Sequence, residues 1–364
     1  MSRDPMSHGR AVVLLNFGGP ETLEQVEEFI FQILSDPDTL QLPFPGWLQN
    51  RLARKIARRR APDVREQYRA IGGGSPLVAA TAQLAKSLET ELRARGHALP
   101  LFTAHRYLPG WTTQTAQALT QQGVEHLLMI PLYPHYSRTT TGSSLKQLTQ
   151  ALAGAGWRGQ AAAVDHYPDA PRYLEALGGR LKSTLSAEGL GSQDTLILCS
   201  AHGLPASYVR RGDPYRQDLE RTVAGLEGAF PGWRFRLSFQ SRVGPMEWLR
   251  PYTDEEIPRL AGEGFRHVVF LPLAFVNDHL ETLHEIGHTY FELARRHGLT
   301  PHRVPAVEDH PAFVAQLADF VEAWGRHHLS DPPQKFLPPG QWLRRNGLWL
   351  AAVGVGLLGS TFIF

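Results

Sequence analysis

The sequence predicts an α/β fold with two parallel sheets of four strands each and a transmembrane helix at the carboxyl end. Eight short runs rich in Val, Ile, Leu and Phe alternate with longer helical patterns, which is typical of parallel sheets with helical crossovers. HLLMIPLYPHY, from His126, resembles HVVFLPLAFVNDH, from His267, so the strands divide most simply into two similar sets. The expected strands are 11–16, 99–103, 126–132, 161–166, 195–200, 234–239, 267–273 and 303–306.

Composition narrows the class of protein. With 42% apolar and 20% charged residues, the chain of 364 residues is long enough for two ordinary globular domains. The net charge of +2 is too small to indicate nucleic acid as a partner. Cys199 is the single cysteine, which excludes an intrachain disulfide, a Cys-rich zinc site and a Cys-ligated iron–sulfur cluster within the chain, and it fits a reducing compartment. The amino terminus has no secretory signal pattern.

The carboxyl end has the pattern of a membrane anchor. GLWLAAVGVGLLGSTFIF, at the end of the chain, carries no charge, and a helix of this length reaches about 27 Å, near the thickness of a bilayer core. Arg344 and Arg345 precede it, and because basic residues favour the cytoplasmic side, we expect the protein at the cytoplasmic face of the membrane. A buried carboxyl-terminal helix is the alternative. The expected division is an amino-terminal domain at 1–167, a second domain at 168–328, a Pro-rich tether at 329–345 and a transmembrane anchor at 346–364.

Four loops follow expected strands at their carboxyl ends, where ligands bind in open α/β sheets. They are LNFGGP, LYPHYS, SAHGLP and FVNDHLE. After the last of them, a regular helix would place Asp278, Glu281, Glu285 and His288 within about a quarter of its circumference, opposite an apolar face. A solvated helix flank is the ordinary explanation of such an acidic face. The position at a strand end favours a functional site instead.

His202 lies in SAHGLP, just past an apolar strand. A lone His is usually a structural hydrogen-bonding residue, but this loop would lie opposite the acidic helix. A His that faces a carboxylate forms either a proton-transfer pair or one end of a metal site. The residues alone leave both interpretations open.

Three further patterns give weaker signals. HEIGH, from His284 to His288, satisfies the H-E-x-x-H pattern of zinc peptidases, although its position at a strand end is foreign to them. IGGGSP, at 71–76, lacks the spacing and the Lys of a phosphate-binding P-loop. LQLPFPGWLQ, at 40–49, is expected to be an irregular apolar lip, and the basic run at 51–60 beside it would suit a membrane surface or an amphipathic anionic substrate.

Seven motifs in order, from about residue 11 to 327, together resemble the ferrochelatase family. They are LLNFGGP, YRAIGGGSPL, HRY, PLYPHYS, SAHGLP, FQSRVGPMEWLRPYTDE and FVNDHLETLHEI. The resemblance implies two Rossmann-like domains flanking a porphyrin cleft. It implies an enzyme that inserts ferrous iron into a porphyrin with release of two protons, at the end of haem biosynthesis; with protoporphyrin IX, the substrate expected from the departures described below, the product is protohaem. Iron would be a substrate, and no cofactor or iron–sulfur cluster would be required.

The resemblance also implies roles for particular residues. His202 and Glu281 would form the catalytic pair, with His202 as proton acceptor or as iron ligand. The residues that would bind or conduct the metal are His202, Glu281, Asp278 and Glu285. The residues that would contact the porphyrin are Phe17, Arg60, Tyr68, Ser75, Arg106, Tyr107, Tyr133 and Phe275.

Two departures from the family pattern bear on the substrate. His284 stands where the family often has Tyr, and Phe17 stands where the coproporphyrin-using branch typically carries a Tyr that can ligate iron. The second departure favours protoporphyrin IX over coproporphyrin III. The alternatives are a coproporphyrin III ferrochelatase, a zinc peptidase built on HEIGH, a non-catalytic tetrapyrrole carrier and, as a minor variant, a cobalt-inserting chelatase. The expected partners are porphyrin, ferrous iron, the membrane and other haem-pathway proteins.

Overall fold

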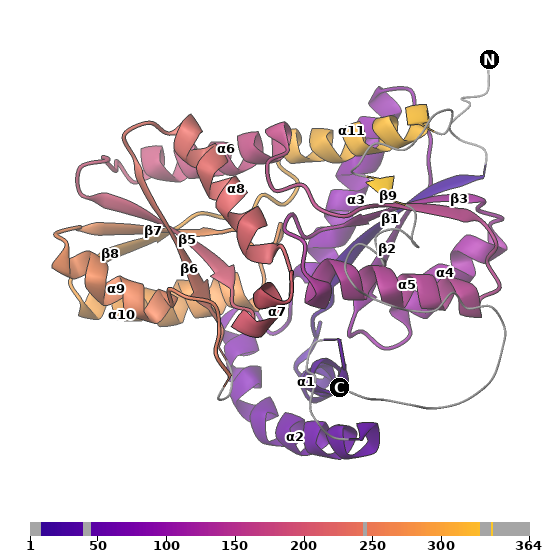
Figure 1. Cartoon of the computed structure of the whole chain (residues 1–364), viewed down its shortest axis with the longest axis horizontal. Coiled ribbons are helices and arrows are strands. Elements are labelled where there is room, and N and C mark those ends of the chain that lie inside the picture. Colours follow the sequence, from indigo (N-terminus) through magenta and orange to yellow (C-terminus); the bar gives the residue numbers. More distant parts are fainter. Residues whose placement is uncertain (1–8, 39–44, 243–245, 328–335, 338–364) are drawn as a thin grey trace.

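Two sheets lie side by side along the long axis of the molecule (Figure 1). The computed structural model describes residues 9–38, 45–242, 246–327, 336 and 337 of the chain. All eight expected strands are present in the described residues, four in each sheet, and each sheet carries helices. The α/β prediction with two parallel sheets is therefore confirmed.

The first sheet contains β1 (Arg10–Phe17), β2 (Leu101–Arg106), β3 (His126–Pro131), β4 (Gln160–Val164) and β9 (Phe336–Leu337). Its order is β2-β1-β3-β4-β9, with the first four strands parallel and β9 antiparallel to β4. In the central strand, Leu14 pairs with Thr103 on one side and with Ile130 on the other. Because helices cover both faces, residues 11–15 are all buried, as their unbroken apolar pattern indicates. The prediction of four strands missed β9.

The second sheet contains β5 (Thr195–His202), β6 (Arg234–Gln240), β7 (His267–Pro272) and β8 (Thr300–Arg303), all parallel in the order β6-β5-β7-β8. The predicted position of the last strand, 303–306, is wrong by three residues. The N–H of Val304 still donates to the carbonyl of Phe270, but Pro305 has no N–H and cannot continue the ladder. The strand therefore lies before this proline.

Helices connect the strands. They are α1 (Val26–Ser35), α2 (Gly46–Ala70), α3 (Leu77–Ala94), α4 (Trp111–Gln121), α5 (Ser143–Gly154), α6 (Pro171–Ala187), α7 (Ala206–Arg210), α8 (Tyr215–Ala229), α9 (Thr253–Gly262), α10 (Phe291–Arg296) and α11 (Pro311–His327). Two π-helices, η2 (Arg138–Gly142) and η3 (Glu281–Tyr290), and a 3₁₀ turn, η1 (Leu23–Gln25), complete the described elements. Both π-helices follow the carboxyl end of a central strand and continue into an α-helix, so each widens the backbone where a ligand would bind.

A single buried cluster crosses from one half to the other. It includes Leu14 of β1, Leu88 of α3, Ile197 of β5, Leu271 of β7 and Phe313 of α11. Helix α11 packs against both α6 and α3, and in Figure 1 it runs along the upper side of the molecule. The two halves therefore share a core, while the predicted boundary between residues 167 and 168 stays a prediction.

The transmembrane helix of the predicted fold class requires a correction. No helix within the described ranges combines the length and apolar character needed to cross a bilayer. The fold of this part is two α/β halves without a membrane span, and the expected anchor at 346–364 lies outside the described residues, as does most of the tether at 329–345. The predicted location at the cytoplasmic face of a membrane depended on that helix and stays a prediction.

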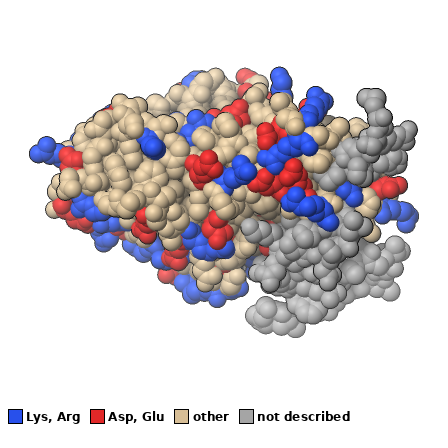
Figure 2. Space-filling view, turned by 90° about the horizontal axis from the view of Figure 1, so that it is seen from above, with Lys and Arg blue, Asp and Glu red and all other residues tan. Residues whose placement is uncertain are grey.

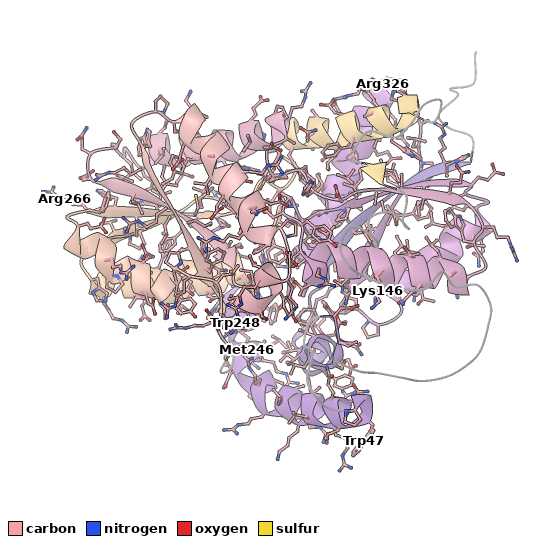
Figure 3. The ribbon with its side chains drawn as sticks, viewed as in Figure 1. Trp47, Lys146, Met246, Trp248, Arg266 and Arg326 are labelled. Atoms are coloured by element: carbon pink, nitrogen blue, oxygen red, sulfur yellow. The ribbon has the colours of Figure 1, made fainter. Side chains whose placement is uncertain are left out.

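The expected apolar lip is also different from its prediction. From Gly46 onward it is not irregular but forms the first turn of α2, because the last prolines precede this point. Trp47 is 64% exposed and lies at the tip of α2, away from both sheets (Figure 3).

On the face of the molecule shown in Figure 2, Lys and Arg side chains mix with Asp and Glu side chains, which agrees with the small net charge of +2.

Acid is expected to destabilise the fold through His135, a buried residue just after β3. Burial lowers the pKa of His135 from 6.5 to about 3, although the charge of Asp218 opposes this effect. Below about pH 6.5 the unfolded chain binds a proton that the folded chain excludes, so His135 lowers the free energy of unfolding by about 1.4 kcal/mol per pH unit. Urea titrations at pH 7, 6 and 5 should show a smaller loss for His135→Gln than for the parent. Equal losses would contradict this assignment.

Candidate active site

His202 and Glu281 lie together at the ends of two neighbouring strands. His202 is the last residue of β5, and Glu281 begins η3, which follows β7. The Nδ1 atom of His202 lies 3.0 Å from the Oε2 atom of Glu281, with the two side chains 35% and 23% exposed. The contact is an ion pair more than an aligned hydrogen bond, since Nδ1 has no partner in hydrogen-bonding geometry within the described chain. The structure thus brings together the two residues that the resemblance paired.

The ion pair shifts the pKa of both partners. Burial opposes charge on His202, but the negative charges of Glu281 and Glu285 outweigh burial and raise the pKa of His202 above 6.5. Burial likewise opposes charge on Glu281, and the positive charge of His202 outweighs it, so the pKa of Glu281 lies well below 4.5. Glu281 is therefore ionised, and His202 binds a proton more readily than a free imidazole does.

Gln240, at the end of β6, holds Glu281 from the other side. Its Nε2 atom donates to the Oε2 atom of Glu281 at 3.3 Å, and its Oε1 atom accepts from the Ser200 hydroxyl at 2.6 Å. The reasoning from sequence missed Gln240. The sequence could have indicated Gln240 as a polar residue at the end of a strand. In the sheet, Gln240 pairs directly with His202.

Glu285 is the second carboxylate of η3. Its oxygens accept hydrogen bonds from the Ser241 N–H at 3.0 Å, from the Ser241 hydroxyl and from the Tyr290 hydroxyl at 2.9 Å. Burial raises the pKa of Glu285, and the negative charge of Glu281 raises it further. Glu285 can therefore take up a proton more easily than an exposed glutamate.

Asp278 does not share the face of Glu281 and Glu285. It lies before η3 begins, and its Oδ1 atom accepts from Nη1 of Arg303, on β8, at 2.7 Å. The prediction that Asp278 and His288 lie on one face with the two glutamates is wrong, because the helix is of the π type and starts at Glu281. Within the described chain, no three His, Cys, Asp or Glu side chains are arranged to hold a metal ion. The metal role of these carboxylates stays a prediction.

HEIGH forms no zinc site of the peptidase type in the described structure. The rings of His284 and His288 stack with centroids 5.2 Å apart, and His288 is exposed. Glu285, which would be the catalytic base of a peptidase, is held by Ser241 and Tyr290. Since no third ligand converges on the two His rings in the described part of the chain, the pattern is accidental.

Aromatic side chains from both halves form a cluster beside the ion pair. The ring centroid of Phe17 lies 4.7 Å from that of Tyr107 and 6.2 Å from that of Phe275. Phe275 in turn lies 6.0 Å from Tyr133 and 4.2 Å from the ring of His279. Four of the eight residues predicted to contact porphyrin therefore lie together, and we call Phe17, Tyr107, Tyr133 and Phe275 the aromatic cluster.

His279 links the aromatic cluster to the ion pair. Its Nε2 atom lies 3.7 Å from Oε2 of Glu281, and its ring is buried. Neither ring nitrogen of His279 has a hydrogen-bond partner in the described structure. A flat apolar ligand on the cluster would thus lie beside polar atoms that can exchange protons.

Arg106 and Tyr107 contact the same carboxylate. The Tyr107 hydroxyl donates to Asp36 Oδ2 at 2.7 Å, and the Arg106 guanidinium forms an ion pair with that oxygen. Tyr107 has a left-handed backbone with φ of 63°, which these contacts hold in place. The positive charge of Arg106 is therefore already compensated by the protein.

The remaining predicted porphyrin residues lie on and after α2. Tyr68 is buried close enough to Glu281 that, besides burial, the charge of this carboxylate raises the pKa of the phenol. Ser75 is buried against Gly19, where a Cβ atom would lie 2.2 Å from the Ser75 Oγ, so only glycine fits. Arg60 is exposed. Tyr68 thus belongs to the surroundings of the ion pair, while Arg60 points to solvent.

Asn16 joins the two halves beneath the aromatic cluster, and the reasoning from sequence missed it. Its Nδ2 atom donates to Thr81 Oγ1 at 2.9 Å and to Asn277 Oδ1 at 3.0 Å, and all three residues are buried. Asn16 lies near the end of β1 and Asn277 follows β7, so each half supplies one amide. The signal was an Asn at the end of each apolar run.

Asn16→Ala is expected to lower the free energy of unfolding by about 2 to 3 kcal/mol, because it leaves the buried Oδ1 atom of Asn277 unpaired and removes the hydrogen bond to Thr81. Urea denaturation measures the effect. Gln83→Ala, which removes an exposed amide from α3, is the matched control and should cost less than about 0.5 kcal/mol. A loss below about 1 kcal/mol for Asn16→Ala would show that the link between the halves contributes little.

Comparisons with known proteins agree with this geometry. The family model for ferrochelatase matches residues 9–324. A ferrochelatase of Geobacter metallireducens is 41% identical over 325 residues, which cover 88% of this chain and all of that protein, and one of Synechococcus sp. (strain JA-3-3Ab) is 40% identical over 335 residues, covering 90% and 96%. The solved structure of SirB from Bacillus subtilis with Fe3+ shares the fold, with a TM-score of 0.53 at 12% identity, covering 89% of this chain and 99% of SirB.

Two α/β halves with a His–Glu pair at the strand ends, together with these relatives, define a metal chelatase that acts on a porphyrin-type substrate. The family model matches most of the chain, and the relatives with identities near 40% are ferrochelatases. The chain belongs to the ferrochelatase family.

Proposed function

We propose that this enzyme inserts ferrous iron into protoporphyrin IX, with release of two protons. The proposal rests on the contact between His202 and Glu281, which the buried His279 joins to the aromatic cluster. A porphyrin on this cluster would present its pyrrole N–H groups to polar atoms at the strand ends. Iron is a substrate in this reaction, and the chain's own residues supply the proton acceptors.

His202 in its neutral form accepts a pyrrole proton, and ionised Glu281 stabilises the imidazolium that results. Glu285, whose pKa is raised, is the next group along η3 that can take a proton toward solvent. Two protons leave and one divalent ion enters, so the porphyrin stays neutral at its centre. Because the pKa of His202 is raised, the rate should increase with pH until this residue is mostly neutral.

The choice of protoporphyrin IX is supported by charge. Coproporphyrin III carries four carboxylates and protoporphyrin IX carries two, so the former needs more free cations. Arg106 and Arg303, near the aromatic cluster and the ion pair, are already paired with Asp36 and Asp278. Phe17 adds an apolar face.

The test is anaerobic insertion of ferrous iron, followed by loss of porphyrin fluorescence, with the two porphyrins side by side. We expect kcat/KM for protoporphyrin IX to exceed that for coproporphyrin III by about tenfold or more, the value of roughly one mispaired charge. A preference for coproporphyrin III would reverse the substrate assignment. Tight binding of both porphyrins without turnover of either would show a carrier and not an enzyme.

A further inference from the structure

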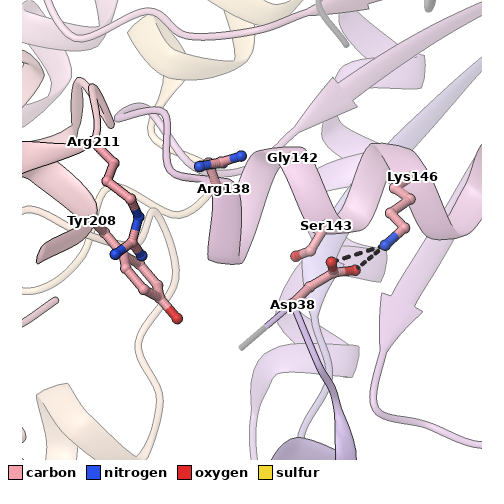
Figure 4. A pocket seen from close by; sticks show the side chains of 7 residues that line it. All are labelled: Asp38, Arg138, Gly142, Ser143, Lys146, Tyr208 and Arg211. Carbon is pink, nitrogen blue, oxygen red and sulfur yellow. Dashed lines mark hydrogen bonds and ion pairs between the residues drawn. The ribbon is translucent and has the colours of Figure 1, made fainter. Parts of the chain in front are cut away.

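A basic cavity lies where η2 and α5 of the first half meet α7 of the second. Its volume is about 190 Å³, roughly six times the volume that one water occupies in the liquid. Figure 4 shows Arg138 between Arg211 on one side and Lys146 on the other. The lining residues are Asp38, Arg138, Gly142, Ser143, Lys146, Tyr208 and Arg211.

Positive charge predominates in this cavity. Its three basic side chains face a single carboxylate, that of Asp38, and both oxygens of Asp38 lie 2.8 Å from the Nζ atom of Lys146. Within the described residues, neither Arg138 nor Arg211 has a carboxylate within ion-pair distance of its guanidinium group. Two guanidinium groups therefore face the cavity without a counter-charge.

The contacts around the cavity hold the two arginines in place. Asp213, two residues after Arg211, accepts hydrogen bonds from the Arg138 N–H at 2.9 Å and from the Ser137 hydroxyl at 3.1 Å, so the start of η2 is tied to the end of α7. The Arg211 guanidinium lies over the ring of Tyr208, 4.9 Å from its centroid. Both arginines thus belong to one scaffold that spans the two halves.

Available hydrogen-bond donors favour an oxyanion. Guanidinium groups match the paired oxygens of phosphate and carboxylate groups. The Tyr208 hydroxyl has no hydrogen-bond partner in the described structure and can donate, and burial raises the pKa of this phenol, which keeps its proton in place. Ser143 already donates to the carbonyl of Thr139 at 2.8 Å, so it contributes an acceptor only.

We propose that this cavity binds a small multivalent oxyanion, of the phosphate or polycarboxylate class, between Arg138 and Arg211. Each half supplies one arginine, so the bound anion would bridge them. The excess of positive charge disfavours a metal cation. This site is independent of the proposed metal insertion, because the residues that line it are distinct from the ion pair and the aromatic cluster.

Isothermal titration of the porphyrin-free, full-length protein with inorganic phosphate and with citrate, in chloride buffers of matched ionic strength, tests the proposal. We expect one saturable site, and the stronger of the two ligands shows which oxyanion class it prefers. Arg138→Gln and Arg211→Gln should each weaken binding by about tenfold or more, the loss expected for a charge-assisted hydrogen bond. Asp38→Asn should strengthen binding by about threefold, because it removes the single carboxylate and frees Lys146.

Arg210→Gln is the matched control, since Arg210 is the last residue of α7, directly before Arg211, but pairs with Glu247 outside the cavity. It should bind the oxyanion as the parent does. Equal weakening by Arg210→Gln, or weaker binding in Asp38→Asn, would show general charge attraction and overturn the proposal. Absence of a saturable site for either ligand would also overturn the proposal.

Saturating protoporphyrin should leave the affinity for the oxyanion unchanged. Loss of oxyanion binding would assign the cavity to the porphyrin site and would overturn the proposal. None of these readouts requires turnover, so failure here is separate from failure of the proposed reaction.

Discussion

His202→Ala is expected to lower kcat for ferrous iron insertion by about a hundredfold to ten-thousandfold, the contribution typical of a positioned general base. His202 is the imidazole that lies 3.0 Å from an ionised carboxylate, and no other residue of the ion pair can exchange a proton in the neutral range. Stopped-flow fluorescence with saturating porphyrin measures kcat directly. The affinity for porphyrin, measured by fluorescence in the absence of iron, should change by less than about threefold.

His284→Ala is the matched control for this variant. His284 lies on the same helix, η3, and stacks on the exposed His288 away from the ion pair. It should keep nearly full activity. A loss of tenfold or less in His202→Ala would transfer the role of base to another residue, of which His279 is the nearest candidate. External imidazole should restore part of the rate in His202→Ala, and it should do nothing for a variant that is merely misfolded.

Glu281→Gln is expected to reduce kcat by about a hundredfold and to move the acid limb of the pH–rate profile to lower pH. The negative charge of Glu281 raises the pKa of His202, so its removal lets the pKa fall back. His202 is then neutral at a lower pH, but the imidazolium that forms during proton transfer has lost its counter-charge.

The pH dependence separates this role from a structural one. Glu292→Gln, which removes an exposed carboxylate paired with Arg296 on α10, should leave both kcat and the acid limb unchanged. A fall in kcat for Glu281→Gln with an unmoved acid limb would show that Glu281 acts on the metal or on the fold and not through His202. Thermal unfolding of each variant shows whether the fold is retained.

Local pattern was enough to predict most of the fold. Strands such as β1 and β7 are short apolar runs that end at Pro, Gly or polar residues, so their type and order follow from sequence. The error in the position of β8 came from two prolines. This edge strand contains Pro301 but ends before Pro305. β9 has two residues within a Pro-rich stretch, and no periodic signal exists at that length.

Those site residues that lie at the carboxyl end of a single apolar strand could be predicted from the sequence. His202 ends one apolar strand and Glu281 follows the loop after its neighbour, and parallel strands bring such ends together. The predicted position of Asp278 was wrong because a regular helix would have placed its side chain with that of Glu281. Its actual partner, Arg303, lies on β8, a strand whose predicted position was wrong by three residues. The cavity around Arg138 and Arg211 combines segments more than seventy residues apart, which no local pattern relates.

The buried cluster that crosses the molecule couples side chains of one half to side chains of the other. Phe313 of α11 packs into the same cluster as Leu88 of α3, so part of the apolar interior is shared by the two halves. A chimaera that joins residues 1–167 of one relative to the remainder of another would set together two surfaces that never adapted to each other. A substitution along this seam is therefore expected to need a compensating change in the other half.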